Sequence, residues 1–535
     1  MIIDARGLNQ GTCIKTDICI AGAGAAGITL ARELSDSSLD VCLLEGGGLS
    51  LDEETEALAA GETSGIPYFD LRKSHPRVLG GATSLWGARG APMNPIDFQA
   101  RPWVPHCGWP IALHELQDYY ERAHHYIGMH TPFDYDDHVW KFFKSQPILF
   151  DDASLRCSAF QFGKTILFGK HYRAVLRQAV HIRVFLHANV TNIQRHPTAN
   201  TIEHIDVRTL NGKHVQVKAE IFILACGGIE NPRLMLLSDT VEPHGLGNQE
   251  DLVGRFFMEH PTTTVGTLEA TNMHGICEHF SPGLVHGRLT EVGMALSDEL
   301  QRSEKCLNTV VMVKPVIGQD ATDSLRRLLW DGRRRTLEEP VATLLKRILS
   351  DPLGLFANLY RHVRGRPKRY NIRSLIVEIR SEQDPTRESR VFLSAEKDAL
   401  GLRRPHLHWV LSDLVKHSMR VTAMTFGREV ARLKLGHFMM EDWLNQEETS
   451  WPPGLIGAHH HMGTTRMSKS VHDGVVDANC KAHTLDNLYV AGSSVFPTAG
   501  FANPTLTILA LVIRLADHLK SRLKTDRVLA RPPHS

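Results

Sequence analysis

Three glycines near the start of the chain have the spacing of a tight turn between a strand and a helix. Gly22, Gly24 and Gly27 follow a short apolar run over residues 16–21 and precede apolar residues at helical spacing over 28–34. In such a turn the first glycine permits the bend, the second lets a phosphate approach the backbone, and the third lets helix and strand pack closely. The helix N-terminus also favours negative charge. The pattern therefore predicts a site for the pyrophosphate of a dinucleotide.

An acidic residue stands where the ribose of that dinucleotide would lie. Residues 40–44 are typical of a second buried strand, and Glu45 follows it directly. Its carboxylate can accept hydrogen bonds from the ribose hydroxyls. NAD and FAD sites share this geometry, so these residues alone leave the dinucleotide open. A second glycine-rich loop over 79–87, and a further strand, glycine turn and helix over 221–234, favour FAD.

A second group of residues suited to chemistry lies toward the other end of the chain. His459, His460 and His461 are consecutive and precede Gly463. An imidazole titrates near neutral pH, so it can act as a general base. Adjacent histidines point in different directions, whereas a three-histidine metal site needs separated positions. We expect a base here and no metal.

The order of the motifs around these histidines resembles the glucose-methanol-choline (GMC) oxidoreductase family. The motifs that carry the resemblance lie at residues 459–467, 474–477, 487–498 and 503–507, and further landmarks of the family lie at 253–255, 260–261, 382–385 and 389–391. The resemblance spans nearly the whole chain. It implies an α/β protein in which a Rossmann-like FAD-binding domain carries an inserted α+β substrate-binding domain. It also implies oxidation of an alcohol.

The resemblance assigns roles to individual residues. His460 matches the family's catalytic histidine, which we expect to act as the base, and Asn503 matches the second active-site position, where an amide can orient the hydroxyl and stabilise developing alkoxide charge. Thr83 and Ser84 are expected near the flavin N5 edge, with simple turn roles as the alternative. The expected cofactor-binding residues are Gly22, Gly24, Ala25, Ala26, Gly27, Glu45, Gly46, Arg77, Gly81, Thr83, Ser84, Val190, Ala225, Gly492, Ser493, Asn503, Pro504 and Thr505.

Within the family, the loop that leads to Trp86 and the ending at 503–505 are similar to the branch of pyranose 2-oxidase and fructose dehydrogenase. The substrate implied is a sugar, glycoside or polyol, with O2 or a quinone- or dye-type compound as electron acceptor. Leu85 stands where pyranose 2-oxidase has a histidine bonded to the flavin, so we expect noncovalent FAD. The alternatives are a non-sugar alcohol, a hydroxynitrile-lyase-type reaction with non-redox FAD, and a NAD-dependent enzyme.

Composition sets the broad class of protein. A chain of 535 residues exceeds the usual limit of one hydrophobic core, which favours two domains. The 60 basic and 59 acidic residues leave a net charge of +1, which gives no global field for attracting nucleic acid or an anionic membrane. The nine cysteines are scattered without a CxxC pair, as in a reducing compartment. With neither a secretory signal nor a long apolar span recognised, we expect a cytoplasmic location.

The domains that we expect are discontinuous. The FAD-binding domain takes residues 1–100, 180–265 and 455–535, and the substrate-binding domain with its lid takes residues 101–179 and 266–454. Within the latter, residues 325–370 are basic and carry apolar residues at helical spacing, which predicts amphipathic helices. A solvated face packed on the domain is the simpler interpretation of that segment. A peripheral contact with a membrane surface or a homo-oligomer contact is the alternative.

Overall fold

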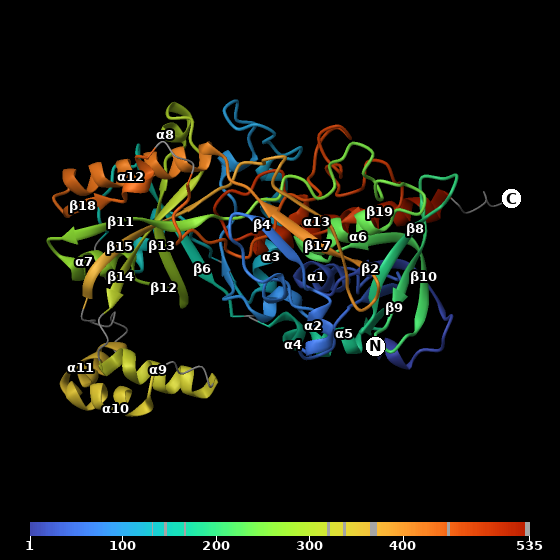
Figure 1. Cartoon of the computed structure of the whole chain (residues 1–535), viewed down its shortest axis with the longest axis horizontal. Coiled ribbons are helices and arrows are strands. Elements are labelled where there is room, and N and C mark those ends of the chain that lie inside the picture. The colour runs from blue at the N-terminus through green and yellow to red at the C-terminus, as the bar shows by residue number, and fades with distance from the viewer. Residues whose placement is uncertain are drawn as a thin grey trace.

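The computed structural model of the chain describes residues 1–130, 132–143, 147–164, 167–317, 321–334, 339–363, 372–446 and 450–529. Two eight-stranded sheets and one three-stranded sheet organise it (Figure 1). The helices are α1 (Ala25–Glu33), α2 (Glu53–Ala57), α3 (Gln117–Tyr126), α4 (Phe168–His171), α5 (Arg173–Gln178), α6 (Gly227–Leu237), α7 (Met273–Phe280), α8 (Asp298–Ser303), α9 (Ala321–Arg334), α10 (Val341–Ser350), α11 (Pro352–Val363), α12 (Asp413–Arg432) and α13 (Thr505–Leu529).

The first sheet is built around parallel strands from both ends of the chain. Its order is β1-β7-β3-β2-β10-β9-β8, with β19 also paired to β10. Strands β1, β7, β3, β2, β10 and β19 pair in parallel, and β8 and β9 are antiparallel additions. The strands are β1 (Ile2–Asp4), β2 (Cys13–Ala21), β3 (Val41–Leu44), β7 (Ile182–Leu186), β8 (Asn189–Arg195), β9 (Ile202–Arg208), β10 (His214–Leu224) and β19 (Leu488–Val490).

The centre of this sheet is covered on both faces, which explains its apolar runs. All four residues of β3 and the last four of β2 are buried, as expected for parallel strands beneath helices. The long helix α13 packs against α1 and α3. In Figure 1 the first strands and the last helix therefore lie together at one end of the molecule.

The second sheet is antiparallel, with order β18-β11-β15-β14-β13-β6-β5 and β12 beside β13. Helix α12 packs on one face through Val415, Met419 and Phe426, which share a core with alternate residues of β15, such as Val377 and Ile379. The remaining strands are β5 (Arg89–Gly90), β6 (Leu155–Phe162), β11 (Thr262–Ala270), β12 (Gly283–Val285), β13 (Arg288–Leu296), β14 (Thr309–Ile317), β15 (Ile372–Ser381) and β18 (Gly436–Met440), and the small sheet has β4 (Glu62–Gly65), β16 (Arg390–Lys397) and β17 (Arg403–Trp409).

The basic segment of residues 325–370 folds partly as amphipathic helices. Helices α9, α10 and α11 form a unit between β14 and β15 that projects from the sheet in Figure 1. Residues 335–338 and 364–370 of the segment lie outside the described residues. In the part of the chain that the structure describes, no helix combines the length and apolar character that crossing a membrane requires.

A buried ion pair ties the loop at Arg101 to Glu382, directly after β15 of the second sheet. Both guanidinium Nη atoms of Arg101 donate to Glu382, at 2.8 and 2.5 Å, and both side chains are fully shielded from solvent. Burial, together with the nearby Glu382 carboxylate, raises the pKa of Asp97 to about 7. Arg101 thus pairs with the buried Glu382 carboxylate, and its charge opposes the rise in the pKa of Asp97.

We expect Arg101→Met to lower the free energy of unfolding by about 3–5 kcal/mol, because Glu382 would be left as an unpaired buried charge. Chemical denaturation followed by circular dichroism measures the change. The double variant Arg101→Met/Glu382→Leu should recover most of the loss. Arg72→Met, which breaks the exposed pair with Asp70, is the matched control and should leave the transition unchanged. An equal loss of unfolding free energy in Arg101→Met and Arg72→Met would contradict the role of the buried ion pair.

Candidate functional site

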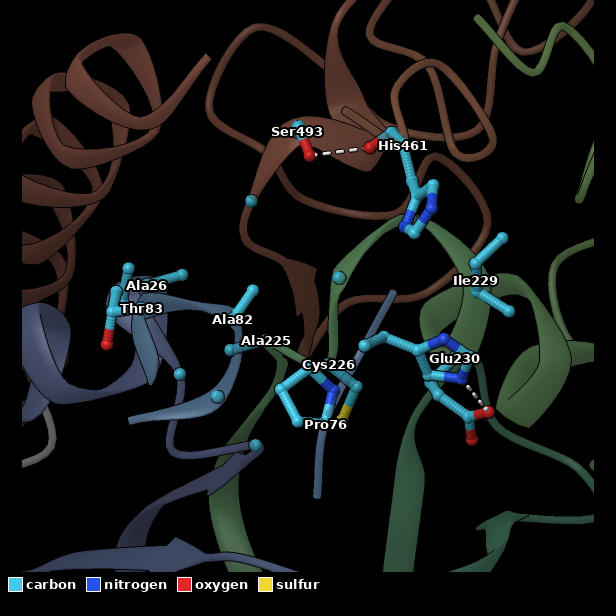
Figure 2. Close-up of a pocket in the computed structure, with 18 of the residues that line it drawn as sticks. Ala26, Pro76, Ala82, Thr83, Ala225, Cys226, Ile229, Glu230, His461 and Ser493 are labelled. Atoms are coloured by element: carbon cyan, nitrogen blue, oxygen red, sulfur yellow. Dashed lines mark hydrogen bonds and ion pairs between the residues drawn. The ribbon is translucent and has the colours of Figure 1, made fainter. Parts of the chain in front are cut away.

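A cavity of about 530 Å³ opens where the carboxyl ends of β2 and β10 meet the histidine segment. Of the residues expected from the sequence, only Gly27 and Ser84 are absent from its lining. Those that line it are Gly22, Gly24, Ala25, Ala26, Glu45, Gly46, Arg77, Gly81, Thr83, Val190, Ala225, His460, Gly492, Ser493, Asn503, Pro504 and Thr505. Segments from both ends and the middle of the chain thus share one cavity. Figure 2 shows part of this wall.

The three glycines of the first turn serve different purposes. Gly22 has φ of +100°, and a Cβ there would lie 2.6 Å from the Ala225 carbonyl oxygen. Gly27 faces the sheet, where a Cβ would lie 1.9 Å from the carbonyl oxygen of Gly22. A Cβ on Gly24 would meet no atom within 4 Å. Gly24 therefore leaves open backbone in the wall, at the N-terminus of α1, where a phosphate can approach.

Glu45 stands at the end of β3 with both carboxylate oxygens anchored. Oε2 accepts from the Ala23 N–H at 3.0 Å, and Oε1 accepts from the Gly47 N–H at 2.9 Å. Burial raises the pKa of Glu45, and the two N–H donors oppose that shift. Each oxygen retains a lone pair, so the carboxylate is fixed in place and can accept hydroxyl groups of a ribose.

Arg77 links residues of a second part of the cavity wall through hydrogen bonds. It donates to Asn189 Oδ1 at 3.2 Å and to Glu230 Oε2 at 2.8 Å. Burial would raise the pKa of Glu230, but the guanidinium groups of Arg233 and Arg77 outweigh it, and that pKa lies well below its usual range. Nε of Arg77 is buried and has no acceptor among the described residues. A polar ligand in the cavity could supply one.

The turn at Gly492 and Ser493 holds the histidine segment against the cavity. Gly492 has φ of +117°, and a Cβ there would meet no atom within 4 Å, so this backbone is also open. The Ser493 hydroxyl donates to the His461 carbonyl oxygen at 2.6 Å, as the dashed line in Figure 2 shows. Open glycine backbone at Gly24 and Gly492, with the anchored Glu45 carboxylate, fits a dinucleotide such as FAD.

The partners of His460 fix which ring nitrogen carries its proton. His260 Nε2 lies 3.3 Å from the Ala499 carbonyl oxygen, which can only accept, so this nitrogen is protonated. Burial lowers the pKa of His260 to about 3, which keeps the ring neutral and makes its Nδ1 an acceptor. His460 Nδ1 lies 2.8 Å from that Nδ1 and must therefore donate to it. Nε2 of His460 is left unprotonated, so its lone pair can accept a hydrogen bond.

Asn503 confirms this assignment from the other side. Arg380 donates through Nη1 to Asn503 Oδ1 at 3.2 Å, so the amide nitrogen of Asn503 points the other way. That nitrogen lies 3.2 Å from His460 Nε2 and donates to it. Burial, followed by the proximity of His260 and Arg380, lowers the pKa of His460 well below its usual range. The result is a neutral imidazole whose basic nitrogen faces a hydrogen-bond donor at the cavity.

Glu259 holds these rings in place through the backbone. Its buried carboxylate accepts from the N–H groups of His260 and Ala458 through Oε2, at 2.8 and 2.9 Å. Oε1 accepts from the N–H of His460 at 2.8 Å and from the Tyr68 hydroxyl. Burial and the adjacent carboxylate raise the pKa of Tyr68, so the phenol remains a donor. One carboxylate thus joins two segments about 200 residues apart.

The two neighbouring histidines have different surroundings. His459 is exposed, and its ring stacks on Phe69 with centroids 4.0 Å apart. His461 is buried against Tyr68 and Phe257. The ring that contacts Asn503 is that of His460. The ring contacts of His459 and His461 are therefore explained by packing.

Arg89 adds a cationic group to the cavity on the side of the second sheet. Its guanidinium lies 3.9 Å from the centre of the Phe160 ring and 3.2 Å from a carboxylate oxygen of Glu291. Burial lowers the pKa of Arg89, and Glu291 opposes the shift. Arg89, Arg380, His260 and Glu259 were not identified as site residues from the sequence. His260 lies in a family landmark, but no local pattern marks the other three.

Known proteins match both the sequence and the fold. Residues 385–511 match the C-terminal family described as GMC oxidoreductase. The fructose dehydrogenase large subunit of Gluconobacter japonicus is 24% identical over 58% of this chain, which spans 48% of that relative's length. The 6'''-hydroxyparomomycin C oxidase of Streptomyces lividus is 24% identical over 97% of this chain and 94% of its own. The structure of pyridoxine 4-oxidase from Mesorbium loti aligns over 94% of this chain and 99% of its own, with a TM-score of 0.53 at 17% identity.

The structural likeness supports the expected GMC oxidoreductase fold, and the sequence matches agree with the motifs around His460. The family match over residues 385–511, the curated relatives and the fold together indicate a GMC oxidoreductase.

Proposed function

We propose that the protein uses noncovalently bound FAD to oxidise an alcohol, with His460 as the base. The observation that carries this proposal is the unprotonated Nε2 of His460, which accepts a hydrogen bond from the Asn503 amide beside a cavity suited to a dinucleotide. A bound FAD would supply the hydride acceptor. Leu85, which lines the cavity, has no group that can bond to a flavin, and this supports noncovalent binding.

Residues of the chain can accept the proton of the substrate hydroxyl and stabilise the negative charge that develops on its oxygen. His460 Nε2 accepts the proton of a substrate hydroxyl placed between it and the Asn503 amide. Asn503 Nδ2 then donates to the oxygen, where negative charge develops. Arg380 keeps the amide nitrogen turned toward that oxygen by holding Oδ1. His260 orients the imidazole ring of His460 in the same way. It accepts a hydrogen bond from the Nδ1–H of His460, so the Nε2 of His460 stays unprotonated.

The substrate that we propose is a sugar, glycoside or polyol. The names of the fructose dehydrogenase and hydroxyparomomycin oxidase relatives support this class. The guanidinium of Arg89 lines the cavity and supplies donors for additional hydroxyl groups. A non-sugar alcohol is the alternative substrate. The electron acceptor that we propose is O2 or a quinone- or dye-type compound.

Anaerobic mixing of the yellow protein with a panel of sugars, glycosides, polyols and simple alcohols tests the proposal. We expect the oxidised flavin band to bleach with at least one polyhydroxylated compound. Bleaching by simple alcohols alone would exclude the sugar-type substrate and retain alcohol oxidation. Product formed from a cyanohydrin without bleaching would instead indicate a lyase. A purified protein that holds no flavin, and takes none up, would contradict the proposal as a whole.

We expect His460→Ala to slow anaerobic flavin reduction by about 10²- to 10⁴-fold, because the base is removed, while FAD remains bound. Stopped-flow absorbance gives the rate, and the yellow colour after gel filtration reports FAD retention. His459→Ala is a matched control one residue away, since that ring is exposed and stacks on Phe69. A similar slowing in both variants would remove His460 from the role of base.

The lowered pKa of His460 predicts an unusual pH profile. The base form is the neutral ring, and a pKa well below the ordinary value of about 6.5 keeps it neutral in mild acid. The rate of flavin reduction at saturating substrate should therefore stay constant as the pH falls through 6.5 and decline only well below it. An acid limb centred near 6.5 would show that the ring titrates as if exposed to water.

Glu45→Ala should weaken FAD binding by about 10- to 100-fold, because hydrogen bonds to a carboxylate contribute about 1.5–3 kcal/mol. Quenching of flavin fluorescence during titration of the apoprotein gives the dissociation constant. Asp40→Ala, at an exposed carboxylate near the other end of β3, should leave that constant unchanged. Unaltered binding in Glu45→Ala would separate this carboxylate from the cofactor.

A further inference from the structure

Helices α9, α10 and α11, here called the insert (residues 321–363), expose an unusual amount of apolar surface. Leu349, Leu353 and Phe356 are 78%, 83% and 71% exposed. Other exposed apolar side chains of the insert are Leu329, Val341, Leu345 and Leu359. Exposed apolar residues scattered singly are normal, but a concentration on one small unit marks an interaction surface.

The exposed side chains follow the repeats of two consecutive helices. Val341, Leu345 and Leu349 recur every four residues on α10, so they form one stripe along it. Leu353 and Phe356 lie on one side of α11, which begins two residues after α10 ends. Other sides of these helices are used for folding the insert: Leu344 is fully buried, and Asn358 donates to Thr322 Oγ1 of α9 at 2.9 Å. The exposed stripes are therefore not needed to hold the helices together.

The insert is also basic. It contains eight arginines and lysines against five aspartates and glutamates, and residues 364–371, which follow it in the sequence, add four more basic residues, although the chain as a whole is nearly balanced. Of those acids, Asp323 pairs with Arg326 and Arg327 at 3.0 and 2.8 Å. Glu339 pairs with Arg347 at 2.7 Å. Lys346 lies exposed directly beside Leu345 of the apolar stripe.

We propose that the insert docks the protein onto an anionic lipid bilayer. An apolar stripe beside basic side chains suits the boundary between acyl chains and anionic headgroups, where α10 and α11 would lie in the plane of the surface. A second copy of the chain is a poorer occupant. A two-fold contact would bring the same basic segment of each copy together, and like charges repel. In Figure 1 the insert stands away from the rest of the chain, with room for a flat surface to meet α10.

Flotation of the full-length, FAD-loaded protein with lipid vesicles tests the proposal. We expect binding to phosphatidylcholine vesicles that contain phosphatidylglycerol, and at least tenfold less binding to pure phosphatidylcholine. High salt should weaken the binding to anionic vesicles. Leu349→Asp and Phe356→Asp should each weaken it about tenfold or more, because an exposed apolar anchor is replaced by a charge that bilayers repel.

Leu284→Asp is the matched control, because this leucine is 60% exposed on β12, outside the insert, and should leave binding unchanged. Lys346→Glu adds a variant without an apolar change and should weaken binding to anionic vesicles only. Circular dichroism and the flavin spectrum check that each variant is folded. No binding to anionic vesicles would overturn the proposal, as would equal losses for Leu284→Asp and Leu349→Asp. A dimer in sedimentation that Leu349→Asp dissociates, without vesicle binding, would assign the stripes to a second copy.

Discussion

The hydrogen bonds to the Glu259 carboxylate are the interaction on which the arrangement of this site depends. A buried carboxylate loses its hydration and must recover it from fixed donors. Here three backbone N–H groups and one phenol supply them, and the N–H groups belong to His260, Ala458 and His460. Both histidine backbones are therefore positioned by a single group. A small displacement of Glu259 would move both rings, and with them the base.

The side chains beyond that carboxylate form a line of hydrogen bonds with one direction. Each donor points the same way, from Arg380 through Asn503, His460 and His260 to the carbonyl of Ala499. The two ends set this direction, because a guanidinium can only donate and a carbonyl can only accept. Burial adds the second constraint, since it disfavours a charged imidazole in the middle. Orientation and protonation of the base thus follow from groups that need not touch a substrate.

Local spacing was enough to predict one half of this arrangement. Gly22 and Gly24 predict a turn, because a tight bend from strand to helix needs glycine at fixed offsets. Glu45 could be placed because it follows a recognisable strand. His460 and Asn503 were expected through resemblance to the family, and the structure brings both to the cavity, although their roles remain predictions. Ser84 was expected at the cofactor, but it lies in the loop without lining the cavity, since a spacing pattern does not tell which way a turn residue faces.

The other half depends on contacts between distant segments. Arg380 follows the core residue Ile379 on β15, and nothing local distinguishes it from Glu378, which pairs with Lys314. Glu259 resembles any other acid until Ala458 and His460 are brought to it. Amphipathic helices within residues 325–370 were predicted from their repeat, because an amphipathic pattern is local, and the projecting helices α9, α10 and α11 are found there. Their separation from the rest of the molecule was not, because it depends on how β14 and β15 extend.

The walls of the cavity come from segments that are made at very different times. Gly24 and Glu45 are translated early, whereas Gly492 and Asn503, together with the helix α13 that packs on α1, follow after nearly all the rest. Because domains usually fold as their segments emerge, the first glycine turn must wait in an incomplete sheet. Strand β19, which pairs with β10, joins that sheet only at this late stage. Cofactor binding and completion of the fold therefore coincide at the end of synthesis. A chain interrupted before α13 would have neither a complete cavity nor a complete fold.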